Sequence, residues 1–348
     1  MPDQRFLTID IGSTWTKAFQ TAIDSENFLN IEKSFRLPTA REDLLLSTET
    51  LLANFSEKEL PKIFVSSLPE AEGLAKKLKA EFVREEGVSK FLVDFFKSAE
   101  TNIVLFDAGS IVLQTEAEPR DVGKYLTYPV DEISLENLLG NRKYRPHILP
   151  NSPKDLEVEE AFLRNALGKI LPEKSKKKLT IIATGGLVSG TPSMSRLALI
   201  VLDVLREHEV AEVFFDRDFF LPSFGTLLAT YKQLQVVTPG PWLDRVGAFI
   251  SLGGPLPLKL DWGYSQLQEI ELSKDEIALV PASREQTINL SFLIEKEKHN
   301  FSVNGGSLGI LLDSREKPLA LSFGQESSRV SVSLWHQMLE KTKNEEAF

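Results

Sequence analysis

Three apolar runs, each ending at a small polar turn, dominate the pattern of hydrophobic and polar positions along the chain. The first run reads Phe-Leu-Thr-Ile, an alternation that is typical of a strand with one buried face. The runs and the residues that follow them are 6–9 before Asp10, 102–106 before Asp107, and 179–184 before Gly185 and Gly186. The pattern therefore predicts three buried strands, each followed by a polar turn.

The first of these strands opens a predicted α/β lobe over residues 1–100. Leucines recur at helical spacing in two stretches with charged residues between them, which indicates amphipathic helices. The expected elements are a hairpin partner strand over 15–19, strands over 27–37 and 62–67, and helices over 41–54 and 70–86. Residues 88–96 fit either a buried strand or a helix, and both alternatives stay open.

A second α/β lobe is predicted over residues 101–246. Its expected elements are the strand before Asp107, a loop and strand over 120–128, a short helix over 133–139, a polar turn over 137–146, helices over 155–171 and 226–234, the strand before Gly185, a helix from Ser193, and a strand over 210–215. Thr191 is the expected N-cap of the helix at Ser193, and Pro192 its first residue.

The pattern changes after residue 246, where Pro-Gly and Gly-Gly pairs separate short apolar stretches. Regularly spaced short strands with turn residues between them are typical of an all-β module. We therefore expect such a module over residues 247–348. Within it, Asn304-Gly305-Gly306 is expected to be the turn of a hairpin between strands at 301–303 and 308–312.

Composition narrows the class of protein. The chain of 348 residues has 42% hydrophobic residues, enough for more than one buried core, and a net charge of −10 that argues against a nucleic-acid surface. It contains no cysteine, which excludes disulfides and thiolate chemistry and fits a cytoplasmic protein. No apolar stretch approaches the roughly 20 residues of a membrane span. We expect a protein without a membrane span or a nucleic-acid partner.

Candidate chemistry gathers at the first turn, Asp10-Ile11-Gly12-Ser13-Thr14. A glycine lets the backbone approach a phosphate closely, and successive backbone N–H groups form an anion-binding nest. Asp10 beside that nest is suited to a hydrated Mg²⁺, which prefers one or two carboxylates together with phosphate oxygens. A plain β-hairpin with a small turn is the alternative interpretation.

Strand–Asp-x-Gly at Asp10 and again at Asp107, followed by strand–Gly-Gly at Gly185, resembles the order of motifs in the actin, Hsp70 and sugar-kinase superfamily. The resemblance implies two ribonuclease H-like lobes that bind ATP between them. It implies that Asp10 and Asp107 hold Mg²⁺ through water and align the attacking water molecule. It also implies a set of nucleotide-binding residues: Gly12, Ser13, Thr14, Lys17, Gly109 and Ser110 on the phosphate side, and Gly185 and Gly186 on the nucleoside side.

A narrower resemblance is carried by residues 215–225, Phe-Asp-Arg-Asp-Phe-Phe-Leu-Pro-Ser-Phe-Gly. This segment, with 10–17, 138–144 and 303–319, is similar to the MutL-type accessory proteins of adenosylcobalamin-dependent glutamate mutase, which are unrelated to the mismatch-repair protein of that name. The resemblance implies a chaperone-like role on a partner enzyme, with a cobalamin-dependent mutase as the candidate. The charged triplet at 216–218 is either a salt-bridged loop or a hinge contact near the nucleotide.

Two functions of different class follow. The first is an accessory protein that binds ATP, hydrolyses it slowly and acts on a partner enzyme through the β module. The second is a degenerate actin-like scaffold that binds nucleotide weakly or not at all. Ser110 favours the scaffold because relatives usually carry a second glycine followed by threonine there, whereas the intact first turn opposes it. A sugar kinase is a weaker third alternative, since no sugar-binding segment is recognisable.

Overall fold

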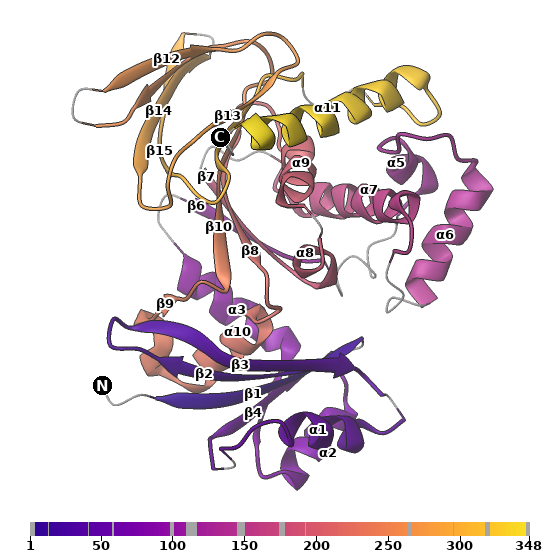
Figure 1. Ribbon diagram of the computed structural model, residues 1–348, viewed down its shortest axis with the longest axis vertical. Coiled ribbons are helices and arrows are strands. Elements are labelled where there is room, and N and C mark those ends of the chain that lie inside the picture. The colour runs from indigo at the N-terminus through magenta and orange to yellow at the C-terminus, as the bar shows by residue number, and fades with distance from the viewer. Residues whose placement is uncertain are drawn as a thin grey trace. The chain divides into compact units, whose positions relative to one another are not determined.

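The chain folds into two compact units (Figure 1). Unit 1 comprises Met1–Lys97 and Asp216–Leu243, and unit 2 comprises Ser98–Phe215 and Asp244–Phe348. The computed structural model describes residues 4–12, 14–40, 42–57, 59–97, 101–108, 117–144, 150–173, 178–191, 193–263, 266–294, 296–316 and 321–345. Both units contain sheets and helices, so the predicted α/β class is confirmed. Residues 216–243 group with residues 1–97 in unit 1. The division into separate domains at 1–100, 101–246 and 247–348 stays a prediction.

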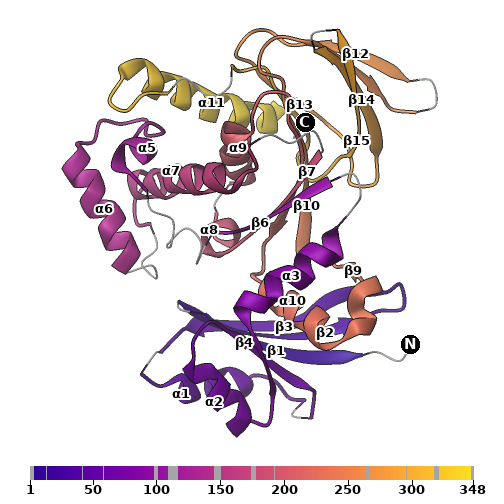
Figure 2. The same cartoon turned by 180° about the vertical axis from the view of Figure 1, so that it is seen from behind.

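Sheet A has six strands and forms the centre of unit 1. Strands β1, β2 and β3 form an antiparallel meander, and β4 and β5 run parallel to β1 on its other side. Helices α1 and α2 cover one face of the sheet, and α3 and α10 cover the other (Figures 1 and 2). The strands in sheet order are β5 (Glu81–Arg84), β4 (Lys62–Ser66), β1 (Arg5–Ile11), β2 (Trp15–Ile23), β3 (Phe28–Pro38) and β9 (Thr238–Pro239); the helices are α1 (Leu44–Leu52), α2 (Glu70–Lys77), α3 (Glu85–Phe96), α10 (Leu221–Thr230) and the 3-10 helix η1 (Lys232–Val236).

The predicted helix over 70–86 is wrong in its second half. Helix α2 ends at Lys77, and Lys79 adopts a left-handed backbone with φ of 55°, which turns the chain back. The next residues form β5, because pairing with β4 gives them a sheet edge to join. The open alternative at 88–96 resolves as helix α3, whose Val88 and Leu92 are buried one turn apart.

Unit 2 is built on two sheets with a shared core. In sheet B, β6, β7 and β8 run parallel, β10 runs parallel to β16, and β13 runs antiparallel to β16. The strands in sheet order are β13 (Ile277–Val280), β16 (Gly309–Asp313), β10 (Leu243–Ser251), β8 (Val210–Asp216), β7 (Lys178–Thr184) and β6 (Thr101–Asp107) for sheet B, and β12 (Leu267–Glu271), β11 (Pro257–Asp261), β14 (Thr287–Ile294) and β15 (Glu297–Asn304) for the antiparallel sheet C.

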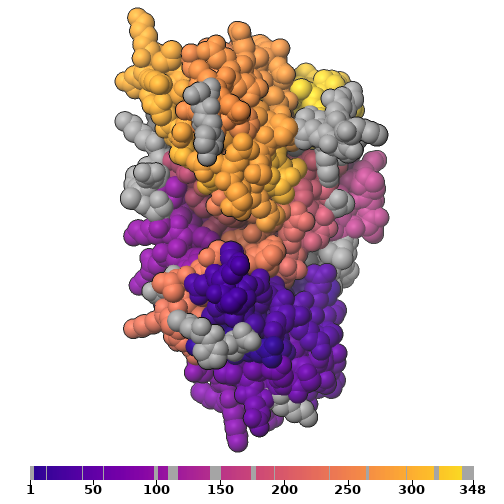
Figure 3. All heavy atoms as spheres, turned by 60° about the vertical axis from the view of Figure 1, so that its left-hand side comes forward, coloured from indigo at the N-terminus to yellow at the C-terminus, as the bar shows by residue number. Residues whose placement is uncertain are grey.

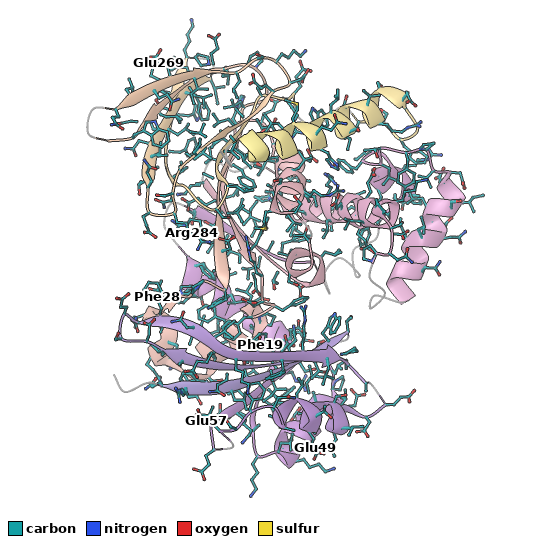
Figure 4. All side chains as sticks on the ribbon, in the orientation of Figure 1. Phe19, Phe28, Glu49, Glu57, Glu269 and Arg284 are labelled. Atoms are coloured by element: carbon teal, nitrogen blue, oxygen red, sulfur yellow. The ribbon has the colours of Figure 1, made fainter. Side chains whose placement is uncertain are left out.

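Sheet C packs one face on sheet B and turns the other outward. Leu258 and Leu290 are buried in the shared core, and the alternating burial of β11 and β14 follows from that arrangement. Atoms of sheet C form part of the molecular surface in Figure 3, and Glu269 on β12 is labelled in Figure 4. Sheet C accounts for part of the predicted all-β module. The remainder differs, because β10, β13 and β16 complete sheet B and residues 326–345 form a helix, α11 (Glu326–Glu345).

Helices of unit 2 lie on the other side of sheet B, in layers that pack on the sheet and on one another (Figure 2). They are α5 (Pro119–Gly123), α6 (Glu132–Tyr144), α7 (Pro153–Ile170), α8 (Gly186–Ser189), α9 (Met194–Val204) and α11. The helix predicted over 155–171 is confirmed as α7. Three predictions here are wrong: α5 replaces the loop and strand over 120–128, α6 runs through the predicted turn over 137–146, and α10 of unit 1 begins at Leu221 rather than at 226.

The expected hairpin at Asn304-Gly305-Gly306 is also wrong. Strand β15 pairs with β14 in sheet C, whereas β16 pairs with β10 and β13 in sheet B, so the segment crosses between sheets. A Cβ on Gly305 would overlap the carbonyl oxygens of Ala282 and Ser283, and one on Gly306 would overlap that of Val246. The glycines are therefore required by the close approach of two backbones.

A buried ionic network anchors the helices of unit 2. The Arg315 guanidinium donates to Asp203 at 2.7 Å and to both carboxylate oxygens of Asp313 at 2.7 and 2.8 Å. Arg164 donates from Nε to the other oxygen of Asp203 at 2.6 Å. The side chains of these four residues are at most 2% exposed, and the Trp335 ring of α11 lies 4.5 Å from the Arg315 guanidinium. The network balances two positive charges with two negative ones, as burial of charge requires.

His336 of α11 contacts this network and makes the stability of the protein depend on pH in the acidic range. Its Nε2 lies 3.2 Å from Nη2 of Arg164, which donates, so the imidazole is neutral. Burial and the nearby Arg164 and Arg196 lower the pKa of His336 to about 4. Between that value and an unfolded pKa of about 6.5, the unfolded chain binds a proton that the native chain does not. The contribution of the neutral His336 to the free energy of unfolding is therefore fully present above about pH 6.5 and is lost as pH falls toward 4.

As pH is lowered across this window, the free energy of unfolding should fall more steeply for the wild type than for His336→Gln. We expect the difference in slope to be about 1 kcal/mol per pH unit. Glutamine is a suitable replacement because its carbonyl oxygen can accept the Arg164 hydrogen bond without titrating. Urea unfolding of both proteins between pH 7 and pH 4.5 measures the difference. Equal slopes for the two proteins would contradict the prediction.

Candidate functional site

The first candidate site lies in unit 1, where β1 and β2 form a tight hairpin. Their register places Asp10 opposite Lys17, and Lys17 Nζ lies 2.6 Å from Asp10 Oδ2. The Lys17 and Asp10 side chains are only 7% and 6% exposed. A buried lysine and carboxylate pair that lies directly beside a glycine turn supplies one cationic and one anionic group for a ligand.

The turn between the strands is held by backbone and threonine contacts. Gly12 N–H donates to the carbonyl of Trp15 at 2.9 Å, and the Thr39 hydroxyl donates to the carbonyl of Gly12 at 2.8 Å. Thr39 N–H donates to the carbonyl of Thr14. Ser13 lies outside the described residues. Because the Gly12 amide is already committed to the turn, a phosphate here would depend on Lys17 and on other amides of the turn.

The segment that follows β8 packs beside this pair, within unit 1. The buried Asp216 carboxylate accepts hydrogen bonds from Phe220 N–H at 3.0 Å and Leu221 N–H at 2.7 Å, and so provides the first turn of α10 with an acceptor. The ring of Phe219 lies 4.5 Å from Lys17 Nζ. Both interpretations of the charged triplet at 216–218 stay predictions. The contact with Lys17 comes from Phe219, which the sequence analysis did not single out.

The second candidate site lies at the carboxyl ends of β6 and β7 in unit 2. These strands are parallel neighbours, and Asp107 pairs in register with Thr184, directly before Gly185. Ala108 N–H donates to the Thr184 carbonyl at 2.8 Å, so the two turns leave the sheet side by side. Carboxyl ends of parallel strands are the usual place for a ligand in α/β sheets. Gly109 and Ser110 lie outside the described residues.

The predicted N-cap of the helix at Ser193 is wrong, and Pro192 lies outside the described residues. Gly185 adopts φ of 105°, a backbone that favours glycine, and Gly186 begins the single-turn helix α8. The longer helix α9 begins only at Met194, with Ser193 rather than Thr191 at its N-cap position. Its N-terminus is therefore separated from the glycines by the whole of α8. Any role of Gly185 and Gly186 depends on close backbone approach and not on the α9 dipole.

The structure thus brings the predicted residues together as two groups. In unit 1, Asp10, Gly12, Thr14 and Lys17 share one hairpin, and in unit 2 Asp107 shares one sheet edge with Gly185 and Gly186. That Asp10 and Asp107 approach the same phosphates stays a prediction. Within the described ranges, no three His, Asp or Glu side chains gather into a metal site. Mg²⁺ commonly takes most of its ligands from phosphate and water rather than from side chains.

Comparison with known proteins adds fold likeness only. No protein-family model and no curated protein matches the sequence. Component A of the (R)-2-hydroxyglutaryl-CoA dehydratase of Acidaminococcus fermentans is similar in structure, with 10% identity, a TM-score of 0.38, and coverage of 66% of this chain and 98% of that chain. A ROK family glucokinase from Streptomyces griseus, in complex with glucose and AMPPNP, is also similar in structure. It has 10% identity and a TM-score of 0.39, and the match covers 66% of this chain and 99% of that chain.

The ethanolamine utilization protein EutJ from Carboxydothermus hydrogenoformans gives 11% identity, a TM-score of 0.36, and coverage of 66% of this chain and 90% of that chain. All three TM-scores lie below about 0.5, so nothing about the activity of this chain follows from them. Separately, none of the helices in the described part of the chain is both long and apolar enough to cross a membrane.

Proposed function

We propose that this chain is a Mg·ATP-binding protein of the actin-like ATPase kind that acts on a partner enzyme. The observation that carries the proposal is the buried Asp10–Lys17 pair beside the Gly12 turn. The strand order of sheet A supports it, because a three-strand meander followed by two strands parallel to β1 is the order expected of a ribonuclease H-like lobe. The recurrence of strand, acid and small turn at Asp107 supports a second phosphate contact.

In this proposal the chain contributes positioning and charge, which suffice for phosphoryl chemistry. Lys17 binds a phosphate oxygen, and Asp10 and Asp107 orient the water shell of Mg²⁺. The turns at Gly12, Ser13 and Thr14 and at Gly109 and Ser110 approach the phosphates, and Gly185 and Gly186 approach the nucleoside. Bound Mg²⁺ supplies neutralisation of the phosphate charge. Hydrolysis is proposed to be slow, since the second turn carries Ser110 in place of a glycine.

The partner belongs to the proposal as well. The similarity of residues 215–225 and 303–319 to MutL-type accessory proteins supports a chaperone-like role on an enzyme, with a cobalamin-dependent mutase as the candidate. We place partner docking on the outward face of sheet C, which is separate in sequence from the proposed nucleotide residues. A degenerate scaffold that does not bind nucleotide is the outcome if the following test fails.

Mg·ATP should raise the melting temperature of the wild-type chain. A ligand that binds only the folded state adds about 2.7 kcal/mol of stability at a hundredfold excess over its dissociation constant. Asp10→Ala alone is a poor test, because it leaves the Lys17 ammonium buried without its carboxylate. The double variant Asp10→Asn with Lys17→Met removes both charges and should fold, yet lose the shift. Differential scanning fluorimetry with Mg·ATP, with Mg²⁺ alone and without ligand measures this.

An equal shift in the double variant would mean that nucleotide binds elsewhere. No shift in either protein at millimolar Mg·ATP would favour the scaffold.

A further inference from the structure

Phe219 has a strained backbone at the edge of the proposed nucleotide site. Its φ is 62°, a left-handed conformation that glycine adopts readily and bulky residues rarely do. The residues that follow it are fixed. Asp216 accepts hydrogen bonds from the N–H groups of Phe220 and Leu221, and the Phe220 ring is fully buried. Strain of this kind persists only where the surroundings impose it.

Packing around the neighbouring ring shows what imposes it. Phe220 contacts Phe19 of β2, labelled in Figure 4, with ring centroids 5.0 Å apart, and Trp242 at 4.8 Å. The Trp242 indole N–H in turn donates to the Leu29 carbonyl at 2.9 Å. Phe220 is therefore locked into the core of unit 1, and Phe219 must turn the other way. Its side chain is only partly buried, so burial of Phe219 itself does not account for the strain.

The strained conformation brings the Phe219 ring to 4.5 Å from Lys17 Nζ. The ammonium thus has the Asp10 carboxylate at 2.6 Å and an aromatic face as a second partner. An aromatic face attracts a cation most strongly when the cation is removed from water, as this one is. A lysine side chain is long and flexible and would otherwise extend to solvent.

We infer that Phe219 is a positioning residue that holds the Lys17 ammonium beside Asp10, in place for a phosphate oxygen of the nucleotide. The inference rests on the proposed function. Asp10 satisfies one N–H donor of the ammonium, and the ring restrains its position without taking a directed hydrogen bond. A second N–H donor can then meet the phosphate without a search through lysine rotamers. The backbone strain is the cost of this placement.

Two substitutions separate positioning from packing. Phe219→Leu keeps an apolar side chain and the strain but removes the aromatic face, whereas Phe219→Gly removes both the ring and the strain. We expect each to weaken Mg·ATP binding by about tenfold in calorimetric titration. We also expect Phe219→Gly to melt at a higher temperature than Phe219→Leu, since glycine relieves the strain. A purely structural residue would not give a more stable variant that binds equally poorly.

A second readout does not depend on nucleotide. Acylation of Lys17 by acetic anhydride, followed by mass spectrometry, should be faster by about threefold or more in both variants, because the ammonium loses its aromatic partner. The matched controls are Phe35→Leu, which removes the ring near Lys33, and Lys79→Gly, which relieves a left-handed residue elsewhere in unit 1. Neither control should change the affinity for Mg·ATP or the acylation of Lys17.

The outcomes are distinct. Wild-type binding of Mg·ATP with unchanged affinity in both Phe219 variants overturns the inference while the proposed function stands. Absence of wild-type binding overturns the proposed function and the part of the inference that concerns the phosphate, and the acylation rates then decide only whether Phe219 holds Lys17. Faster Lys17 acylation in the variants supports positioning by Phe219, and equal rates overturn it.

Discussion

Replacing Arg315 by methionine should lower the free energy of unfolding by about 3–5 kcal/mol, because it removes the guanidinium that pairs with a buried carboxylate. Asp313 is fully buried and receives two hydrogen bonds from the Arg315 guanidinium, at 2.8 and 2.7 Å. Asp203 would keep Arg164, whose Nε lies 2.6 Å from it. The main damage should therefore fall on the end of β16. Hydrogen exchange of the β16 and α9 amides under native conditions measures it separately from unit 1.

A double variant identifies the cause. Arg315→Met with Asp313→Leu removes both members of the pair, so at least half of the lost stability should return. Lys259→Met serves as the matched control, since the Lys259–Glu269 pair is exposed and contributes little. A single Arg315→Met variant within about 1 kcal/mol of wild type would show that the network is not the anchor of unit 2.

Alanine at Gly247 should be at least as damaging, through the backbone of sheet B. Gly247 of β10 pairs with Gly309 of β16, and a Cβ at Gly247 would overlap the Gly309 carbonyl oxygen. Its φ of 150° is itself unfavourable for other residues. Because neither backbone can move without breaking the sheet, we expect a loss above about 4 kcal/mol or failure of unit 2 to fold.

Gly73→Ala should have the opposite effect and raise the free energy of unfolding. Gly73 lies in α2 and an added Cβ meets nothing within 4 Å, so alanine should stabilise the helix by about 0.5–1 kcal/mol. Urea unfolding of both variants measures the two effects together. A Gly247→Ala protein as stable as wild type would contradict the close approach of β10 and β16.

Local pattern was sufficient to predict the hairpin of unit 1. The alternation of residues 6–9 and the small turn after Asp10 specify a hairpin, and a hairpin of that length places position 17 opposite position 10. The Asp10–Lys17 pair is therefore a consequence of sequence spacing. Likewise, the strands that end at Asp107 and Thr184 follow from the apolar runs at 102–106 and 179–184, and the structure pairs these strands in parallel. In both cases the interacting residues belong to elements that the pattern identifies by itself.

Interactions between distant segments could not be predicted in this way. Arg315 and Asp203 are 112 positions apart, and no local pattern in α9 marks Asp203 as a buried partner. The Phe219 contact with Lys17 depends on how Phe220 packs, which is a property of the whole core of unit 1. The helix over 70–86 failed for a related reason, since pairing with β4 decides the state of residues 81–84. Tertiary contacts override local propensity at such positions.

Calorimetric titration of Mg·ATP into the full chain tests the central claim most directly. It should be made at two temperatures, since a binding enthalpy can vanish at one of them. We predict saturable binding at one site, weakened by about tenfold or more when EDTA removes Mg²⁺, because the phosphates then lose the cation that we propose Asp10 to orient. Absence of binding at both temperatures with millimolar Mg·ATP would contradict the claim.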